Sequence, residues 1–337
     1  MLKRLFYIIP LIFFLSNCRN EVELLAPYQD IPIVYCILNQ NDSIHYVRLE
    51  KAFAGPKNAF EMALEHDSIY YMQADMVLER WKDQEFISSM DVRVTDTVSK
   101  DSGIFAYHTN LMYTAKGQLN GDSEYRIKIH IPETGKDITA STRLVDGIRI
   151  IKPEFTRPSI NFSAYNNYLE VEWISSPYAR IYFLQFRFNY LEVLGRDTTK
   201  KEQIWSIAHF TSNHSNGGEK METSVNHQRF YTWLSLKIPP PENGIRRIAE
   251  KKAFDIMFTV GGEELYTYME VYDPDHNMMT ERPVYSNISD GIGIFSARYQ
   301  QEIKGKALTF PSIDSIAHGQ FTDHLGFVDS TDDYYNR

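Results

Sequence analysis

Short runs of alternating apolar and polar residues recur along the chain between turn residues, and they favour β-structure throughout. The clearest run is Arg126–Ile131, where every second residue is isoleucine, followed by a Pro-Glu-Thr-Gly turn and a second run over residues 138–144. A period of two places apolar side chains on one face of a strand, and a turn between two such runs indicates a hairpin. The pattern predicts an all-β fold, and the 14% aromatic content suits the faces of packed sheets.

Residues 1–18 have the three parts of a bacterial lipoprotein signal. Lys3 and Arg4 precede an apolar run over residues 5–15, and Cys18 stands where the cleavage site is expected. The run is too short to span a bilayer, which takes about 17–25 residues. We therefore predict a signal peptide over residues 1–17 and acylation of Cys18, with an ordinary secretory signal or a short anchor as the alternative. Asn17 departs from the small residue that usually precedes the lipidated cysteine.

Charge and cysteine content limit the partners and the covalent links of the chain. It has 35 Lys and Arg residues against 44 Asp and Glu residues, a net charge of −9 without long runs of one sign, which argues against nucleic acid as a partner. Once Cys18 carries lipid, Cys36 is the only thiol left, so no intramolecular disulfide can form. Cys36 lies in the apolar run over residues 31–38, which predicts a buried and inert thiol.

The length suggests two domains, and we predict two β-sandwiches of the immunoglobulin or fibronectin type III kind. The second sandwich is indicated by Trp173 at the end of one alternating run and by the aromatic alternation over residues 180–190 that follows. Runs over residues 230–238 and 253–260 predict further strands, and Gly261-Gly262 predicts a hairpin into a strand over residues 263–271. The predicted boundaries are 1–17 for the signal, 18–29 for a tether, 30–146 for the first sandwich, 147–160 for a linker, 161–310 for the second sandwich, and 311–337 for a tail that frays beyond Phe327.

Two local features stand out within the first sandwich. Asn58, with Glu61 three residues later, is typical of a helix N-terminus and predicts one short inserted helix over residues 58–66. A turn ends at Tyr125, just before the alternating run, which is typical of a sandwich corner. There the tyrosine hydroxyl hydrogen-bonds back to the backbone of the turn.

Several segments together resemble a known family. They are the lipoprotein signal, the hairpin over residues 39–50, the segment over residues 63–70, and above all residues 283–298, with Gly291 and Gly293 on either side of Ile292. The chain resembles the Bacteroidota lipoproteins of the domain of unknown function 4249 family along nearly its whole mature length. The resemblance implies an envelope lipoprotein without an established activity, often encoded near TonB-dependent outer-membrane transporters. The glycines predict positive φ or a close backbone approach before a final buried strand.

The common sequence motifs for catalysis, metals and cofactors do not occur in the chain. It lacks the nucleophile elbow, the His-Glu-x-x-His motif and the phosphate-binding glycine loops, so we predict no catalytic residue and no cofactor. His209, His214 and His227 do not have the spacing of a zinc site, and the Asp273–His276 turn lacks the oxygen ligands that calcium requires. Glu263 and Glu264 would point to opposite faces of a strand and could not act as a pair.

One short pattern recurs. Aspartate followed by Ser or Thr, and then by a small, aliphatic or Thr residue, resembles the O-glycosylation sequon of secreted Bacteroidota proteins. Turns that lead into β-branched strands give the same triplet, which is the alternative interpretation. The candidate attachment sites are Ser43, Ser68, Thr97, Thr198, Ser315 and Ser330.

These observations favour a lipid-anchored outer-membrane protein, on either the periplasmic or the surface face, that serves as a binding or accessory module of a TonB-dependent transporter. Acyl chains attach a protein to a membrane without a spanning segment. The alternatives are a structural or adhesion protein of the surface and a hydrolase that acts on polysaccharide or peptide.

Overall fold

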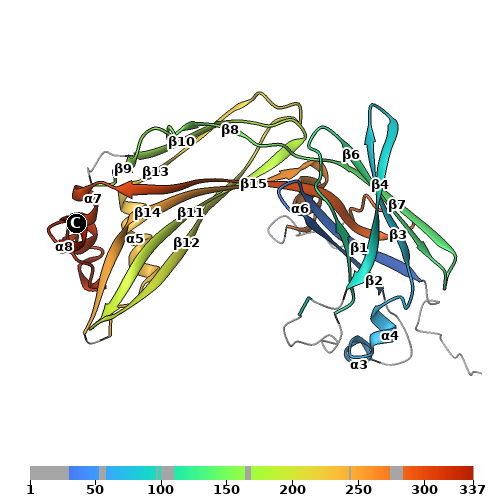
Figure 1. Ribbon diagram of the computed structural model, residues 1–337, viewed down its shortest axis with the longest axis horizontal. Coiled ribbons are helices and arrows are strands. Elements are labelled where there is room, and N and C mark those ends of the chain that lie inside the picture. The colour runs from blue at the N-terminus through green and yellow to red at the C-terminus, as the bar shows by residue number, and fades with distance from the viewer. Residues whose placement is uncertain are drawn as a thin grey trace, which may run out of the picture.

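The computed structural model describes residues 30–52, 58–95, 98–99, 110–163, 168–242, 244–273 and 284–336. Most of this backbone is β, with one large mixed sheet, one small sheet and a few short helices, so the predicted all-β fold is confirmed. Figure 1 shows two lobes joined in an arch. Within the described residues, no helix has the length and apolar character needed to cross a bilayer.

The N-terminal lobe is an antiparallel set of strands in the spatial order β1-β2-β5-β4-β3-β6-β7. In β6, Tyr125 and the isoleucines at 127, 129 and 131 are at most 1% exposed, which confirms the inward face predicted from the alternation. The Tyr125 hydroxyl accepts the backbone N–H of Asn120 at 2.9 Å, so the predicted sandwich corner is also confirmed. The strands are β1 (Ile31–Asn39), β2 (Ile44–Ala52), β3 (Asp75–Lys82), β4 (Glu85–Thr95), β5 (Met112–Lys116), β6 (Glu124–Ile131) and β7 (Lys136–Arg143).

The helical insertion of this lobe differs from the prediction. Asn58 is the N-cap, and its side chain accepts the N–H groups of Phe60 and Glu61 at 2.7 and 3.4 Å, as its position suggested. The predicted single helix is wrong, because there are two short helices, α3 (Ala59–Ala63) and α4 (His66–Ile69). Glu65 adopts an extended backbone between them and acts as the N-cap residue of α4.

The C-terminal lobe has two layers of strands. Figure 1 shows the small sheet, β13-β10-β8, above the part of the large sheet that contains β12-β11-β14-β15. Trp173 is fully buried between them against Tyr182, Phe210 and Phe258, which confirms its predicted core position. The strands are β8 (Arg149–Lys152), β9 (Ser159–Ile160), β10 (Tyr168–Ile174), β11 (Ala179–Leu194), β12 (Asp197–Thr211), β13 (Lys220–Asn226), β14 (Ile245–Gly262) and β15 (Ile292–Leu308).

Two predicted strands of this lobe are helices. Residues 230–237 of the strand predicted over 230–238 belong to α5 (His227–Lys237), which buries Phe230, Tyr231, Trp233 and Leu234 in the core at helical spacing. Asn226 caps α5 by accepting the N–H of Arg229 at 2.9 Å. The predicted Gly-Gly hairpin is also wrong, because Gly262 is the N-cap of α6 (Glu263–Tyr272).

The C-terminal residues are packed, so the predicted fraying beyond Phe327 is wrong. The elements here are α7 (Phe310–His318), the 3-10 turn η2 (Asp323–Leu325) and α8 (Asp333–Asn336). Val328 N–H donates to the Arg247 carbonyl at 2.9 Å, and the Tyr335 hydroxyl donates to the Ala249 carbonyl at 2.8 Å. Both contacts hold this segment against β14.

Strand β15 belongs to both lobes. Its first part pairs in parallel with β1, from Ile33 opposite Ile292 to Asn39 opposite Arg298. Its later part pairs antiparallel with β14, and Arg298 lies opposite Gly261 at the crossover. One continuous strand therefore joins the lobes, and the final residues of the predicted second sandwich complete the sheet of the first.

The segment just before β15 explains the residues that carry the family resemblance. The Asn287 side chain accepts the N–H of Phe295 at 3.0 Å and donates to its carbonyl at 2.7 Å, so it pairs with β15 as a strand residue would. Gly293 has φ +121°, and a Cβ there would lie 2.0 Å from the Val34 carbonyl oxygen. The predicted need for positive φ and a close backbone approach is confirmed at Gly293, which is the second residue of the last strand and does not precede it.

Candidate functional site

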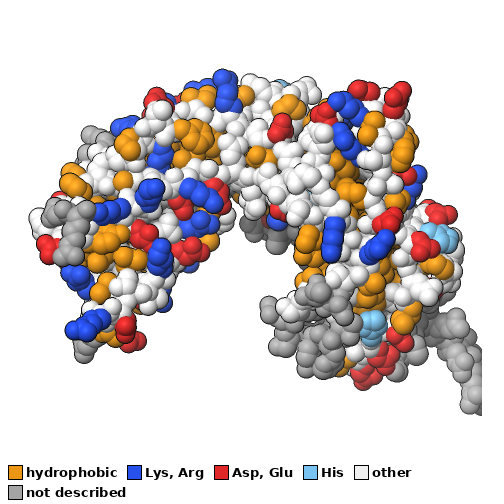
Figure 2. All heavy atoms as spheres, in the orientation of Figure 1, with side chains coloured by type: hydrophobic (Ala, Val, Ile, Leu, Met, Phe, Trp, Pro, Cys, Tyr) orange, Lys and Arg blue, Asp and Glu red, His pale blue; other side chains and the backbone are white. Residues whose placement is uncertain are grey.

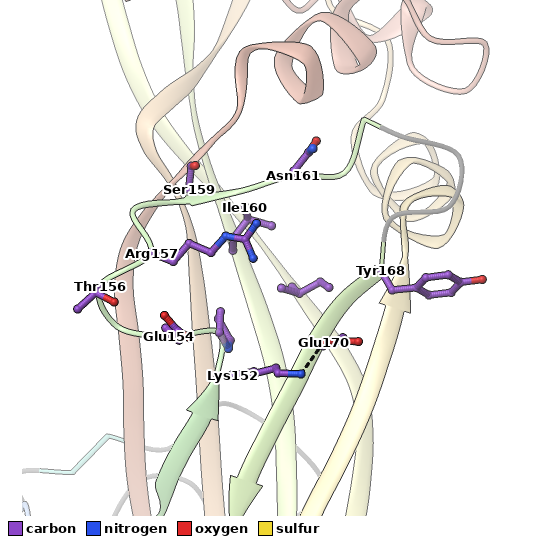
Figure 3. A pocket seen from close by; sticks show the side chains of 11 residues that line it. Lys152, Glu154, Thr156, Arg157, Ser159, Ile160, Asn161, Tyr168 and Glu170 are labelled. Carbon is purple, nitrogen blue, oxygen red and sulfur yellow. Dashed lines mark hydrogen bonds and ion pairs between the residues drawn. The ribbon is translucent and has the colours of Figure 1, made fainter.

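A polar cavity of about 660 Å³ lies between the loop that joins β8 to β9 and the start of β10. Its volume is within the range of small-molecule sites, about 300–1,000 Å³. Figure 3 shows charged and polar side chains around it, with the Arg157 side chain directed from the loop into the space. The polar and charged lining residues include Lys152, Glu154, Arg157, Asn161, Tyr168 and Glu170.

A buried lysine holds the loop that forms one wall of this cavity. Lys306, in β15, is 4% exposed, and its ammonium donates to the carbonyl oxygens of Glu154 and Phe155 at 3.0 and 2.9 Å and to that of Arg157. Burial lowers the pKa of Lys306. Three carbonyl dipoles satisfy the three ammonium protons, so the loop is fixed by a cation that has no carboxylate partner among the described residues.

The other wall of the cavity is neutralised by ion pairs. Lys152 lies 2.8 Å from Glu170 and 2.6 Å from Glu172, as Figure 3 marks for Glu170. Hydrogen bonds to these two carboxylates raise the pKa of Lys152, and the bond from Lys152 lowers the pKa of Glu172. Both groups therefore stay charged near neutral pH and are unsuited to proton transfer.

Arg157 is the charged group of the cavity best placed to bind a ligand. Its guanidinium forms no ion pair with any residue that the structure describes, and the side chain is exposed. Glu154 is a single carboxylate without a second free carboxylate beside it, so the arrangement lacks the pair needed for general acid and base catalysis. The cavity can bind a polar molecule through hydrogen bonds. None of its described lining residues activates a nucleophile.

The candidate glycosylation sites do not form one site. Among them, Ser43, in the β1–β2 turn, and Thr198, near the start of β12, are exposed. The Ser315 hydroxyl donates to the Pro311 carbonyl at 2.8 Å within α7. The partly buried candidates are Ser68, Ser315 and Ser330, while Thr97 and the predicted lipidation site, Cys18, lie outside the described residues.

Cysteine and histidine have no metal-binding arrangement in the described part of the chain. No group of three or more His, Cys, Asp or Glu side chains there could hold a metal, and this set includes His209, His214 and His227. Asp273 is described, whereas His276 lies outside the described residues. Cys36 is 3% exposed, which confirms its predicted burial, and burial raises the pKa of its thiol to about 12.

The two glutamates at the start of α6 differ in environment. Glu264 accepts the hydroxyls of Thr142 in β7 and Ser296 in β15, at 3.0 and 3.1 Å, and burial raises its pKa. Glu263 is half exposed and pairs with Arg180 at 3.2 Å. The prediction that these glutamates lie in a strand is therefore wrong, because they begin helix α6. They still do not act as a pair, since Glu264 links β7 to β15 through the two hydroxyl groups.

Sequence reasoning missed the cavity and its main residues. Pro153 and Pro158 indicated only a linker, and Lys306 follows Gly305 in a run that resembles a solvated strand. Side chains two positions apart in a strand lie on the same face, so Lys306 shares a face with the buried Leu308. This spacing was the only local signal that Lys306 is buried. The three carbonyls that bind it lie about 150 residues earlier in the chain.

Comparison with known proteins gives no family. No family model and no curated protein matches the chain. Among solved structures it is similar to one described as a cytokine receptor complex, crystal form 1A, with 7% identity, 81% of this chain and 97% of that chain covered, and a TM-score of 0.20. A score this low does not define a shared fold.

Proposed function

We propose that this chain is a lipid-anchored binding module of the outer membrane that works as an accessory of a TonB-dependent transporter. The signal-like N-terminus supports the anchor, and the resemblance to the Bacteroidota lipoprotein family supports the transporter as partner. The observation that carries the proposal is the sharing of β15 by both lobes, because it fixes them as one extended scaffold.

The surface of the arch suits a macromolecular partner. Figure 2 shows a wide hollow between the lobes and charged side chains of both signs over the left lobe. A rigid scaffold with a mixed surface of this kind can present contacts to a partner without rearrangement, which limits the entropy lost on binding. The ion-paired lining of the cavity near β10 supports binding over catalysis.

The test uses the full chain expressed with its signal and a C-terminal tag. We expect the wild type to fractionate with outer membranes and to recover a TonB-dependent transporter after mild solubilisation, as identified by mass spectrometry. Cys18→Ala is the matched control, and it should leave the membrane fraction because the acylation site is gone. Failure to recover a transporter from the lipidated protein would refute the accessory role. Turnover of a glycan or peptide panel would favour the hydrolase instead.

A further inference from the structure

Strand β12 forms one edge of the large sheet. It pairs with β11 on one side, and no described strand pairs with its other side, along the lower border of the left lobe in Figure 1. The pairing with β11 is uninterrupted from Asp197 to Ser206, after which the register shifts. Alternate residues of an edge strand direct their N–H and C=O groups outward. This stretch is therefore a template for one more strand.

A cavity of about 380 Å³ opens between β12 and α5. Trp205 of β12 and Trp233 of α5 stack with ring centroids 5.2 Å apart and an interplanar angle of 10°. Both indoles are largely buried, whereas Leu236 is 78% exposed and supplies an apolar wall. Directly opposite residues of neighbouring strands share a face of the sheet. A residue of an added strand opposite Trp205 would thus direct its side chain toward this cavity.

The charge of the cavity is unusual for so acidic a protein. Its described lining contains no Asp or Glu, and α5 has no acidic residue, although the net charge of the chain is −9. The Arg229 guanidinium lies 5.9 Å from the centre of the Trp205 ring and forms no ion pair with any described residue. A carboxylate bound beside an apolar side chain would complement it.

We propose that β12 and this cavity bind an extended segment of a partner protein, which adds to the sheet as a further strand. An aromatic side chain of the segment occupies the Trp205–Trp233 cavity, and an acidic residue two positions away pairs with Arg229. Main-chain hydrogen bonds supply affinity in this mode of recognition, and the side-chain pocket supplies sequence preference. The inference rests on the proposed binding function and gives that function a surface.

The test uses the full chain and a probe that carries a fluorescent dye on its N-terminus, dye-Thr-Val-Asp-Thr-Phe-Val-Thr-amide, in fluorescence anisotropy titrations. Two N-methylated forms of the probe each block one alternate set of amides. We expect saturable binding of the parent probe and of one N-methylated form, and binding at least about tenfold weaker for the other, a difference of about 1.4 kcal/mol. Equal binding of all three forms, or no saturation up to about 1 mM, overturns the proposal.

Two charge reversals on the same helix test the cavity. Arg229→Glu should weaken binding of the probe about tenfold and should strengthen binding of a probe with Lys in place of Asp. Lys237→Glu is the matched control, because Lys237 is exposed on α5 and does not line the cavity, and it should change affinity less than about twofold. Equal effects of the two substitutions overturn the role of Arg229.

The membrane pull-down separates this inference from the proposed function. A transporter recovered equally by the wild type and by Arg229→Glu leaves the accessory role standing and overturns the docking site. The wild type could also dimerise as its concentration rises, and the probe could abolish that dimerisation. This result would show that a second copy of the chain occupies β12, and it would overturn the proposal of a different partner.

Discussion

Replacement of Gly293 by alanine tests the junction between the lobes most directly. The added Cβ would lie 2.0 Å from the Val34 carbonyl oxygen, 2.9 Å from its carbonyl carbon and 3.0 Å from its nitrogen. All three contacts are with the backbone of β1, so no side-chain rotation can relieve them. One way to relieve them is for β1 and β15 to separate at this point. The other is for residue 293 to change its φ from +121°, which would alter the direction of the rest of β15.

The expected cost follows from two terms. A non-glycine residue in this backbone region costs about 1–3 kcal/mol. Separation of the strands removes about two backbone hydrogen bonds, each with a net value of about 1 kcal/mol. Together they predict a loss of about 3–5 kcal/mol, a large fraction of the 5–15 kcal/mol typical of total stability.

The assay is urea unfolding followed by circular dichroism, with Gly135→Ala as the matched control. Gly135 also has positive φ, +68°, in the turn between β6 and β7, but a Cβ there meets nothing within 4 Å. The control should therefore lose only the conformational cost, about 1–2 kcal/mol. A difference between the two variants of less than about 1 kcal/mol would refute the reasoning that the backbone approach at Val34 requires glycine.

Three further substitutions test other contacts. Tyr125→Phe removes the hydroxyl that accepts the Asn120 N–H and should cost about 1 kcal/mol in the same unfolding assay, and an unchanged midpoint would contradict the corner contact. Lys306→Met leaves three loop carbonyls without their donor, so it should lower the free energy of unfolding by about 1–3 kcal/mol. It should also speed limited proteolysis near residues 154–157, and an unchanged cleavage rate would contradict the role of Lys306. Burial raises the pKa of Glu264 above its ordinary value of 4.5, so folding favours its protonated form, and the stability from it is lost as pH rises through the folded-state pKa. Glu264→Gln should flatten this fall between pH 4.5 and neutrality, and an unaltered pH profile would rule out that contribution.

Local patterns predicted local structure well. The alternation in β6, the Asn58 cap and the Tyr125 corner each depend on residues a few positions apart, and each is found in the structure. The errors at α5 and α6 have a shared cause. Segment α5 contains Phe, Tyr and Trp, and α6 contains three Tyr and one Val, all of which favour strands, while burial of one helical face decided α5. Asn226, as a cap residue before α5, was the missed signal.

Long-range contacts were beyond local reasoning. The pairing of β1 with β15, the loop bound by Lys306 and the cavity between β12 and α5 join segments that no periodicity relates. Sequence reasoning identified the region before β15 as distinctive and gave a reason for its glycines. It did not give the partner strand, because a parallel pairing leaves no turn between its strands as a marker.

The shared strand also sets the order in which the chain can fold. Ile33 and Ile292 are neighbours in the sheet but lie about 260 residues apart in the chain. Because the chain is made, and under the proposed function exported, from its N-terminus, β1 emerges well before β15. During that interval the β1 edge that later receives β15 has no partner, and an open edge can pair with other chains. The first lobe therefore cannot finish folding on its own, and a holding chaperone that covers β1 until β15 emerges would raise the yield of native protein.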